Sequence, residues 1–256
     1  NGGCIYFFPK FIKNPLNAKR KFYLNDLKLN SKNIIIRHSF TYIHIFQYLF
    51  SNKVKDSNPY KKEDFFFNSS KIWISGYFQS YKYFENIIKS LILELISPIK
   101  LYGQYIDLSK NIIKQKSVAM HIRRGDYVSN PSTNKYHGLL NKRYFDAALS
   151  KLYKLEKNNI NIYVFSDDIE WCKKNFTKQK KFNFVDIKER DSIQEIKLMF
   201  LCHHFIISNS SFSWWPAFLS QSKGKIVLYP ESWTSAQPNL DDFIPSSWTS
   251  IKNENH

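Results

Sequence analysis

The stretch SVAMHIRRGDYVSN, residues 117–130, decides how the chain can fold, because an apolar run ends there in two adjacent arginines. Side chains alternate between the faces of a strand, so Arg123 and Arg124 cannot both point to solvent from within a buried strand. The pair must stand at the strand end, where we expect Gly125 to let the backbone turn. Ligands bind at this edge of open α/β sheets, so two guanidinium groups there indicate an anion site.

Short runs rich in β-branched and aromatic residues recur beyond this stretch and alternate with helical patterns. The expected strands are 117–122, 161–166, 182–187, 205–210 and 225–230. The expected helices are 140–157, 169–176, 192–204 and 214–221. Such alternation predicts an α/β fold with a doubly wound parallel sheet.

The first hundred or so residues are rich in aromatic side chains and less regular in pattern. Residues 87–96 predict a helix that Pro98 ends, whereas residues 40–50 fit a buried helix or a strand equally well. We predict two domains, an N-terminal lobe over residues 1–112 and a C-terminal lobe over residues 113–256.

The composition excludes several classes of protein. With 256 residues, 43% of them hydrophobic, the chain can form a substantial globular core. No run approaches the roughly eighteen apolar residues of a membrane span, and no secretory signal is visible. The widely spaced Cys4, Cys172 and Cys202 argue against a disulfide framework or a structural zinc site and suggest a cytoplasmic, reducing location.

The formal net charge of +17 invites a nucleic-acid interpretation, because clustered cations release counterions from phosphate backbones. The lysines are scattered among asparagine and isoleucine, however, and codon usage in an AT-rich genome explains that pattern as well. We therefore expect no nucleic-acid partner. Peripheral contact with an anionic membrane surface, such as the inner membrane, is a second partner that the charge suits.

Residues 207–218, ISNSSFSWWPAF, form a second candidate site. A strand is expected to end at the Asn-Ser-Ser triplet 209–211, and a helix to begin near Ser213. Serine and asparagine are good N-caps, so capping alone explains them, although amides and hydroxyls at a helix N-terminus also bind anions. If the sheet brings this turn beside Arg123, two anion-binding elements converge on one site.

Three patterns have structural explanations beside functional ones. Arg123 and Arg124 can form salt bridges with helix carboxylates instead of binding a ligand. Asp167 and Asp168 resemble a metal-binding pair, but the acidic N-terminus of the next helix explains them better. Residues 202–204, CHH, should lie on a helix, where neighbours point about 100° apart and cannot chelate one ion together. We expect no metal site.

Five motifs occur in the order typical of one family. They are GYFQSYKYF (76–84), HIRRGDY (121–127), FSDDIEWCK (165–173), LMFLCHHFIISNSSFSWWPAF (198–218) and KIVLYPESW (225–233). Over residues 70–235 the chain resembles glycosyltransferase family 11, the bacterial α-1,2-fucosyltransferases. The resemblance implies a GT-B-like architecture of two Rossmann-like lobes, the N-terminal one on the acceptor side and the C-terminal one binding the GDP-sugar.

The resemblance also implies a reaction. L-fucose would move from GDP-fucose to a galactoside hydroxyl in α-1,2 linkage, with inversion and without a metal, in surface glycan synthesis. GDP-fucose is then the donor substrate rather than a cofactor, and no other cofactor is expected. The acceptor would be a galactose-containing glycan, which can be carried on a lipid.

The same resemblance assigns roles to individual residues. Arg123 would hold the diphosphate and stabilise GDP as it leaves, while Arg124 would support it or bond within the fold. His121 and Glu195 would contact the guanine. The residues expected to bind the phosphates are Asn209, Ser210, Ser211 and Ser213.

Catalysis adds a requirement for proton transfer. Breaking a glycosyl phosphate builds negative charge on the diphosphate, and one positioned donor can contribute about 3 kcal/mol there. The attacking hydroxyl benefits from a general base. Asp126 is the first candidate and His137 the second, although pairing with an arginine explains Asp126 equally well.

Three features depart from the family pattern. The family's glycine-rich opening loop is missing, and residues 21–30 resemble the segment that follows it, so we expect a truncated N-terminal lobe. Glu195 stands where aspartate is usual. Pro216 and Phe218 replace glycine and tryptophan, and we expect Pro216 in a first helical turn, where proline is tolerated. An inactive relative that only binds nucleotide or glycan is the alternative, ahead of a nucleic-acid-binding protein.

Overall fold

The computed structural model describes residues 80–157, 159–176, 181–235 and 240–253 fully, together with the backbone of four short N-terminal strands. The chain divides into two compact units, Asn1–Pro98 with Asn239–Pro245 and Ile99–Pro238 with Ser246–His256. The two lobes predicted to meet at residue 112, and their roles, stay a prediction. The expectations for Cys4 and for residues 21–30 and 40–50 lie outside the described residues.

The smaller unit contains two pairs of parallel strands and a helical segment. The strands are β1 (Ile5–Phe7) with β2 (Ile34–Ile36), and β3 (Asn52–Lys55) with β4 (Ile72–Ser75). The helical segment comprises η4 (Tyr81–Tyr83), η5 (Glu85–Ile87), α2 (Ile88–Leu91) and the π-helical turn η6 (Ile92–Ile96), which confirms the predicted helix. The Oγ of Ser80 donates to the backbone oxygen of Asp242 in α10 (Leu240–Phe243) at 2.7 Å.

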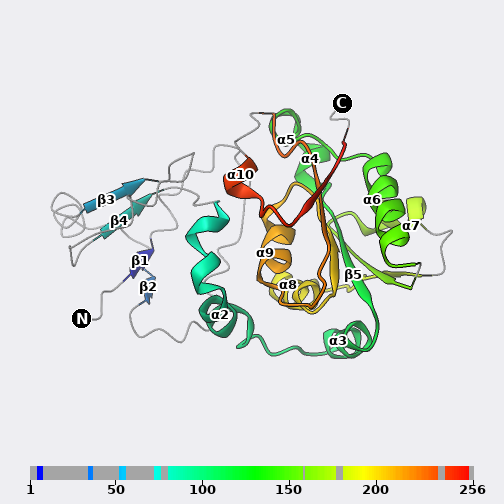
Figure 1. The fold of residues 1–256 in the computed structure, drawn as a ribbon, viewed down its shortest axis with the longest axis horizontal. Coiled ribbons are helices and arrows are strands. Elements are labelled where there is room, and N and C mark those ends of the chain that lie inside the picture. Colours follow the sequence, from blue (N-terminus) through cyan, green and yellow to red (C-terminus); the bar gives the residue numbers. More distant parts are fainter. Residues whose placement is uncertain are drawn as a thin grey trace. The chain divides into compact units, whose positions relative to one another are not determined.

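The larger unit is built on a six-stranded, wholly parallel sheet (Figure 1). Its strands are β5 (Ser117–Ile122), β6 (Asn161–Ser166), β7 (Phe182–Phe184), β8 (His204–Ile206), β9 (Val227–Pro230) and β10 (Thr249–Ile251). Their spatial order is β10-β9-β8-β5-β6-β7. The first strand of this unit, β5, therefore lies in the middle of the sheet. The chain adds β6 and β7 on one side of it and then β8, β9 and β10 on the other, which confirms the predicted doubly wound sheet. The topological switch point lies between β5 and β8.

Helices cover both faces of this sheet. In Figure 1, α6 (Lys142–Leu155) and α7 (Ile169–Phe176) lie on one side of β5, and α8 (Ser192–Phe200) and α9 (Ser211–Leu219) lie on the other. The helix α3 (Gln104–Lys114) packs on α8. Because the sheet is covered twice, all six residues of β5 are buried. The core residues that α6 contributes are Tyr144, Phe145, Ala148, Leu149 and Leu152.

Several element boundaries differ from the predicted ones. The strand β8 ends at Ile206 rather than at residue 210, because the Oγ of Ser208 donates to the backbone oxygen of His121 at 2.7 Å and the chain leaves the ladder. The helix α9 consequently begins at Ser211, and Pro216 lies in its second turn. The prediction that Pro216 lies in the first turn is wrong. In the second turn, proline removes one helical hydrogen bond.

Two further corrections concern neighbouring segments. The helix α8 ends at Phe200, and the backbone N–H of His203 donates to the oxygen of Ser117 at 3.0 Å. Residues 202–204 therefore lead into the sheet. The prediction that they lie on a helix is wrong. The strand β7 extends only over Phe182–Phe184, because it is an edge strand that pairs with β6 alone.

Candidate active site

The carboxyl ends of β5 and β8 lie side by side at the switch point of the sheet. The strands pair directly, with Met120 opposite Ile206. Beyond the ladder, the Nδ1 of His121 lies 2.9 Å from the Oγ of Ser213 in the first turn of α9. The structure thus brings together the strand end and the helix N-terminus that the sequence singled out, although they are far apart along the chain.

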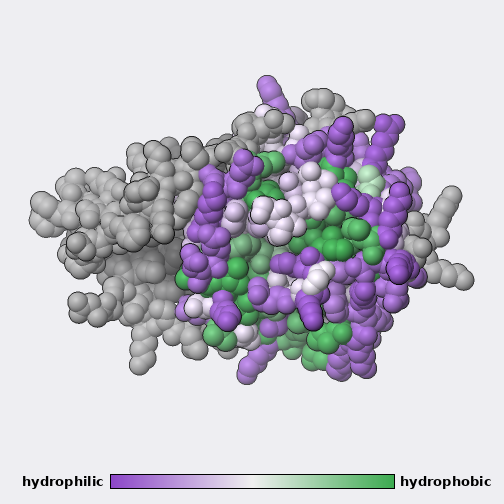
Figure 2. All heavy atoms as spheres, viewed as in Figure 1, coloured by the Kyte–Doolittle hydropathy of each residue, from purple (hydrophilic) through white to green (hydrophobic). Residues whose placement is uncertain are grey.

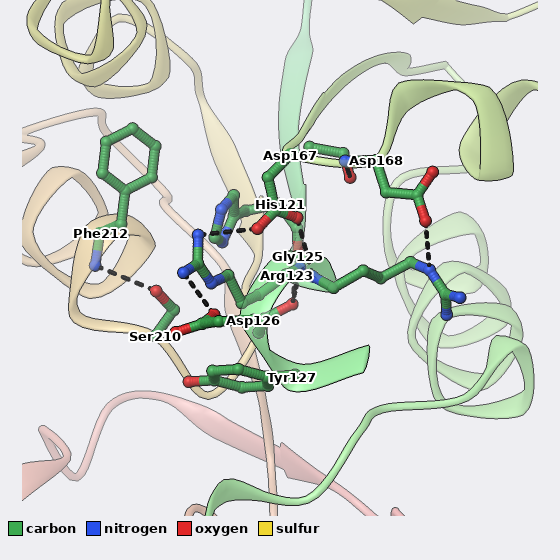
Figure 3. Close-up of polar contacts among 12 residues, drawn as sticks. His121, Arg123, Gly125, Asp126, Tyr127, Asp167, Asp168, Ser210 and Phe212 are labelled. Carbon is green, nitrogen blue, oxygen red and sulfur yellow. Dashed lines mark hydrogen bonds and ion pairs between the residues drawn. The ribbon is translucent and has the colours of Figure 1, made fainter. Parts of the chain in front are cut away.

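Arg123 lies at this junction between two carboxylates (Figure 3). Its Nη2 donates to the Oδ1 of Asp126 at 2.5 Å, and its Nη1 lies 2.7 Å from the Oδ2 of Asp167. Its backbone N–H donates to the Oγ of Ser208 at 3.1 Å. The side chain keeps 28% of its surface exposed, so the guanidinium is oriented by the protein and still accessible from solvent.

Arg124 points the other way and serves the fold (Figure 3). Its Nε donates to the Oδ2 of Asp168 at 2.9 Å, and its guanidinium carbon lies 4.1 Å from the ring centroid of Trp171. Because both partners belong to the start of α7, Arg124 fastens that helix to the end of β5. Of the two roles predicted for Arg124, the geometry matches bonding within the fold.

Gly125 is required because the carboxylate of Asp167 lies close to its Cα, and not because its φ is positive. Its φ is not positive, since the described glycines with positive φ are Gly103, Gly138 and Gly224. A Cβ at Gly125 would instead lie 2.5 Å from the Oδ2 of Asp167. That carboxylate also accepts the backbone N–H of Arg124 at 2.8 Å. The chain does turn here, as expected, because α4 (Gly125–Ser129) begins directly after the strand end, but the glycine makes room for Asp167 rather than supplying a positive φ.

His121 is buried and neutral at the bottom of the site. Burial, reinforced by the positive charges of Arg123 and Arg190, lowers the pKa of His121 from 6.5 to about 3. The Oγ of Ser213 donates to the backbone oxygen of Ser210 at 3.2 Å, so it can accept the proton of Nδ1. This tautomer leaves Nε2 as a hydrogen-bond acceptor.

The pKa of His121 predicts how stability depends on pH. Below pH 6.5 the unfolded chain binds a proton at His121 that the folded chain refuses until about pH 3, so acid favours unfolding. We expect this residue alone to cost about 2 kcal/mol of unfolding free energy between pH 7 and pH 5. Urea denaturation of the wild type and of His121→Asn at both pH values measures it, because the variant should lose less stability on acidification. Equal losses would contradict the prediction.

Glu195 forms a buried ion pair that the sequence did not indicate. Arg190 donates to both of its carboxylate oxygens, from Nε at 2.7 Å and from Nη2 at 2.6 Å, and the Glu195 side chain is only 1% exposed. Burial raises the pKa of Glu195, and Arg190 opposes that shift. The positive charge of Arg190 contributes to the lowered pKa of His121, and the negative charge of Asp167 contributes to the raised pKa of Arg190. Contact of Glu195 with guanine stays a prediction.

The N-terminus of α9 is preorganised. The Oγ of Ser210 accepts the backbone N–H of Phe212 at 3.3 Å, as an N-cap does. Ser211, the first residue of the helix, is exposed, whereas Ser213 is 1% exposed. At the other end of α9, the Nζ of Lys225 donates to the backbone oxygens of Ala217, Phe218 and Ser220. The shortest of these distances is 2.6 Å, to Ala217. The amides of the first turn are therefore held in place for an anion.

Tyr127 joins the parts of the site. Its hydroxyl donates to the backbone oxygen of Asn209 at 2.9 Å, and the ring of His137 stacks on it at 4.8 Å. The guanidinium carbon of Arg123 lies 5.6 Å from the same ring. Asn209 is 1% exposed and donates to the backbone oxygens of His137, Gly138 and Trp233, so its side chain ties three segments together. Of the two general-base candidates, Asp126 contacts Arg123 directly, whereas His137 is linked to it through the ring of Tyr127.

Sequence reasoning missed three residues of this site. Asp167 was assigned to the next helix N-terminus, a role that Asp168 fills by accepting the N–H of Trp171 at 3.2 Å. Tyr127 stood inside a recognised motif and could have been found there. Arg190 ends the stretch DIKER, residues 186–190, which gave no local signal. Within the described residues, no group of three or more His, Cys, Asp or Glu side chains could hold a metal ion.

A parallel sheet in this strand order defines a Rossmann-like α/β protein, and the cationic and hydroxyl groups at its switch point form a candidate anion site. The chain belongs to glycosyl transferase family 11, whose sequence model matches residues 9–252. This membership confirms the resemblance carried by the five motifs.

Relatives in several organisms are similar to the chain. The Escherichia coli alpha-1,2-colitosyltransferase is 36% identical over 69% of this chain and 61% of its own length. The Escherichia coli O-antigen biosynthesis glycosyltransferase WbnK is 29% identical over 73% of this chain and 65% of its own. A Caenorhabditis elegans galactoside 2-alpha-L-fucosyltransferase is 27% identical over 68% and 51%. The chain thus spans less than two thirds of the length of these relatives.

Among solved structures, POFUT1 in complex with GDP matches 67% of this chain and 58% of its own length. The TM-score is 0.38 and the sequence identity is 10%.

Proposed function

We propose that the chain belongs to an enzyme that transfers L-fucose from GDP-fucose to a galactoside hydroxyl in α-1,2 linkage. Family membership and the names of the relatives support a glycosyltransferase of this kind. One observation carries the proposal: an accessible guanidinium, Arg123, and the amides of the first turn of α9 meet at the switch point of the sheet. That edge is where α/β proteins bind phosphorylated ligands.

The chemistry follows from the charges at this edge. The bond between the sugar carbon and the diphosphate oxygen breaks, and the electron pair leaves with GDP. Arg123, now shared by Asp126 and Asp167, exchanges at least one carboxylate for phosphate oxygens and stabilises the charge that develops. The α9 amides, with the Ser210 and Ser211 hydroxyls nearby, supply further donors. Fixed cations and dipoles thus perform the task that a metal performs elsewhere, so the proposal needs no metal.

The acceptor side completes the reaction. The acceptor hydroxyl attacks from the face opposite the diphosphate, forms the new carbon–oxygen bond and inverts the anomeric centre. Its proton passes to a base, for which Asp126 is the first candidate and His137 the second. We place the acceptor on the N-terminal lobe of a GT-B-like pair, and we propose a lipid-linked galactoside at the cytoplasmic face of the inner membrane.

One relative suggests a second donor. The Escherichia coli protein that is 36% identical is named for colitose rather than for fucose. Fold and site charge do not distinguish two sugars on the same diphosphate. Nucleotide-linked colitose is therefore the second candidate donor, and the anion site would serve both in the same way.

Calorimetry and a transfer assay test the proposal together. We expect GDP to bind in EDTA, ADP to bind at least about tenfold more weakly because the base is read, and GDP-fucose to be turned over with a galactoside acceptor. Single-stranded RNA is the control for the net charge, and its binding should vanish at high salt whereas GDP binding persists. GDP binding without turnover of either sugar donor would identify a binding-only relative, and no GDP binding would refute the site.

A further inference from the structure

The helix α3 packs on α8, but part of its apolar surface stays exposed to solvent. Tyr105 and Ile112 are buried, at 2% and 0% exposed, and the hydroxyl of Tyr105 accepts the backbone N–H of Asp191, the N-cap of α8, at 2.8 Å. Beside them, Ile106 and Ile113 are 39% and 58% exposed, and they are seven residues apart, so they share one face. Tyr102, just before the helix, is 54% exposed. We call Tyr102, Ile106 and Ile113 the α3 stripe.

Lysines border the α3 stripe. Lys110 is four residues after Ile106 and three before Ile113, so it lies on the same face, with its side chain 61% exposed. Lys114 follows one turn later and is exposed as well. The ion pair of Lys110 with Asp107, at 2.9 Å, is largely exposed to solvent and therefore weak. In Figure 2, hydrophobic side chains lie at the lower edge, where Figure 1 shows α3, next to hydrophilic ones.

This combination matches an anionic lipid surface. Isoleucine and tyrosine side chains enter the headgroup region, while lysines extend along the apolar surface and reach lipid phosphates. A second copy of the chain suits the α3 stripe less well, because a stable dimer buries about 800 Å² from each partner and three partly exposed side chains supply less. No described helix combines the length and the apolar character needed to cross a bilayer.

We propose that the α3 stripe, with Lys110 and Lys114, docks the protein onto anionic phospholipid. The inference extends the proposed function, since it would bring the transferase to a lipid-linked acceptor. It can still fail independently: vesicle binding requires no nucleotide, and GDP binding requires no vesicle.

The test is sedimentation with vesicles of phosphatidylcholine alone or with about one third phosphatidylglycerol. We expect binding only to the anionic vesicles. Each lysine near such a surface contributes roughly fivefold to partitioning, so Lys110→Gln with Lys114→Gln should lower it about 25-fold. Adding Ile113→Gln should bring the loss to about 100-fold. Circular dichroism confirms that the variants are folded.

A matched control exists on α6, where Leu155 is 55% exposed and Lys151 and Lys154 are exposed beside it. The triple variant Leu155→Gln, Lys151→Gln, Lys154→Gln removes the same groups and the same charge, and it should bind as the wild type does. Equal loss in both triple variants would show that net charge alone drives adsorption and would overturn the proposal. So would an α3 variant that binds unchanged, or one that turns a dimer into a monomer.

Discussion

We expect Arg123→Lys to lower kcat of the proposed sugar transfer about 100- to 1,000-fold and to change the melting temperature by only a few degrees. Lysine keeps the positive charge but lacks the planar fork that contacts two partners at once. In the structure the fork contacts Asp126 and Asp167 at once, a geometry that the ammonium group of lysine cannot reproduce. Stability changes little because the side chain is partly exposed and the charge balance is preserved.

Steady-state kinetics with GDP-fucose, together with calorimetry of GDP, measure this effect. Arg143→Lys is the matched control, because it makes the same exchange at an exposed position of α6. A loss confined to KM would indicate that Arg123 binds the ground state and the transition state equally. Turnover like that of the wild type in Arg123→Lys would remove this residue from the mechanism.

We expect Gly125→Ala to lower kcat of the proposed transfer about 100-fold although alanine carries no polar group. The new Cβ would lie 2.5 Å from the Oδ2 and 3.2 Å from the Cγ of Asp167. The carboxylate cannot simply rotate away, because Arg123 and the backbone N–H of Arg124 hold it. Its displacement would misplace Arg123, and the strain should cost about 2 kcal/mol of unfolding free energy.

A double-mutant cycle separates the clash from other effects of alanine. In an Asp167→Ala background the clash partner is absent, so Gly125→Ala should cost less than about 0.5 kcal/mol. Gly103→Ala is a control for backbone strain, since Gly103 has a φ of +53° and no atom within 4 Å of an added Cβ. It should reduce stability modestly and leave GDP affinity unchanged. An equal cost of Gly125→Ala in both backgrounds would exclude Asp167 as the cause.

The sequence predicted the repeating parts of the fold well. Runs of β-branched and aromatic residues, and the helical pattern between two of them, located β5, β6 and α7 at their observed residues, and the arginine pair marked the end of β5. The motif order identified the family. Boundaries were wrong where side chains compete with the backbone ladder, as Ser208 does at the end of β8, because no local pattern reports which partner a hydroxyl finds.

The sequence by itself thus determined the alternation of strands and helices and the family, and it predicted an anion site at a strand end. Only the tertiary structure decided how the two arginines differ, with Arg123 at the site and Arg124 against Trp171. The structure also paired Glu195 with Arg190 and set Asp167 against Gly125. The physical reason is the distance along the chain over which each interaction acts. The local pattern of residues encodes which face of an element is buried, whereas ion pairs between different elements depend on how strands and helices pack.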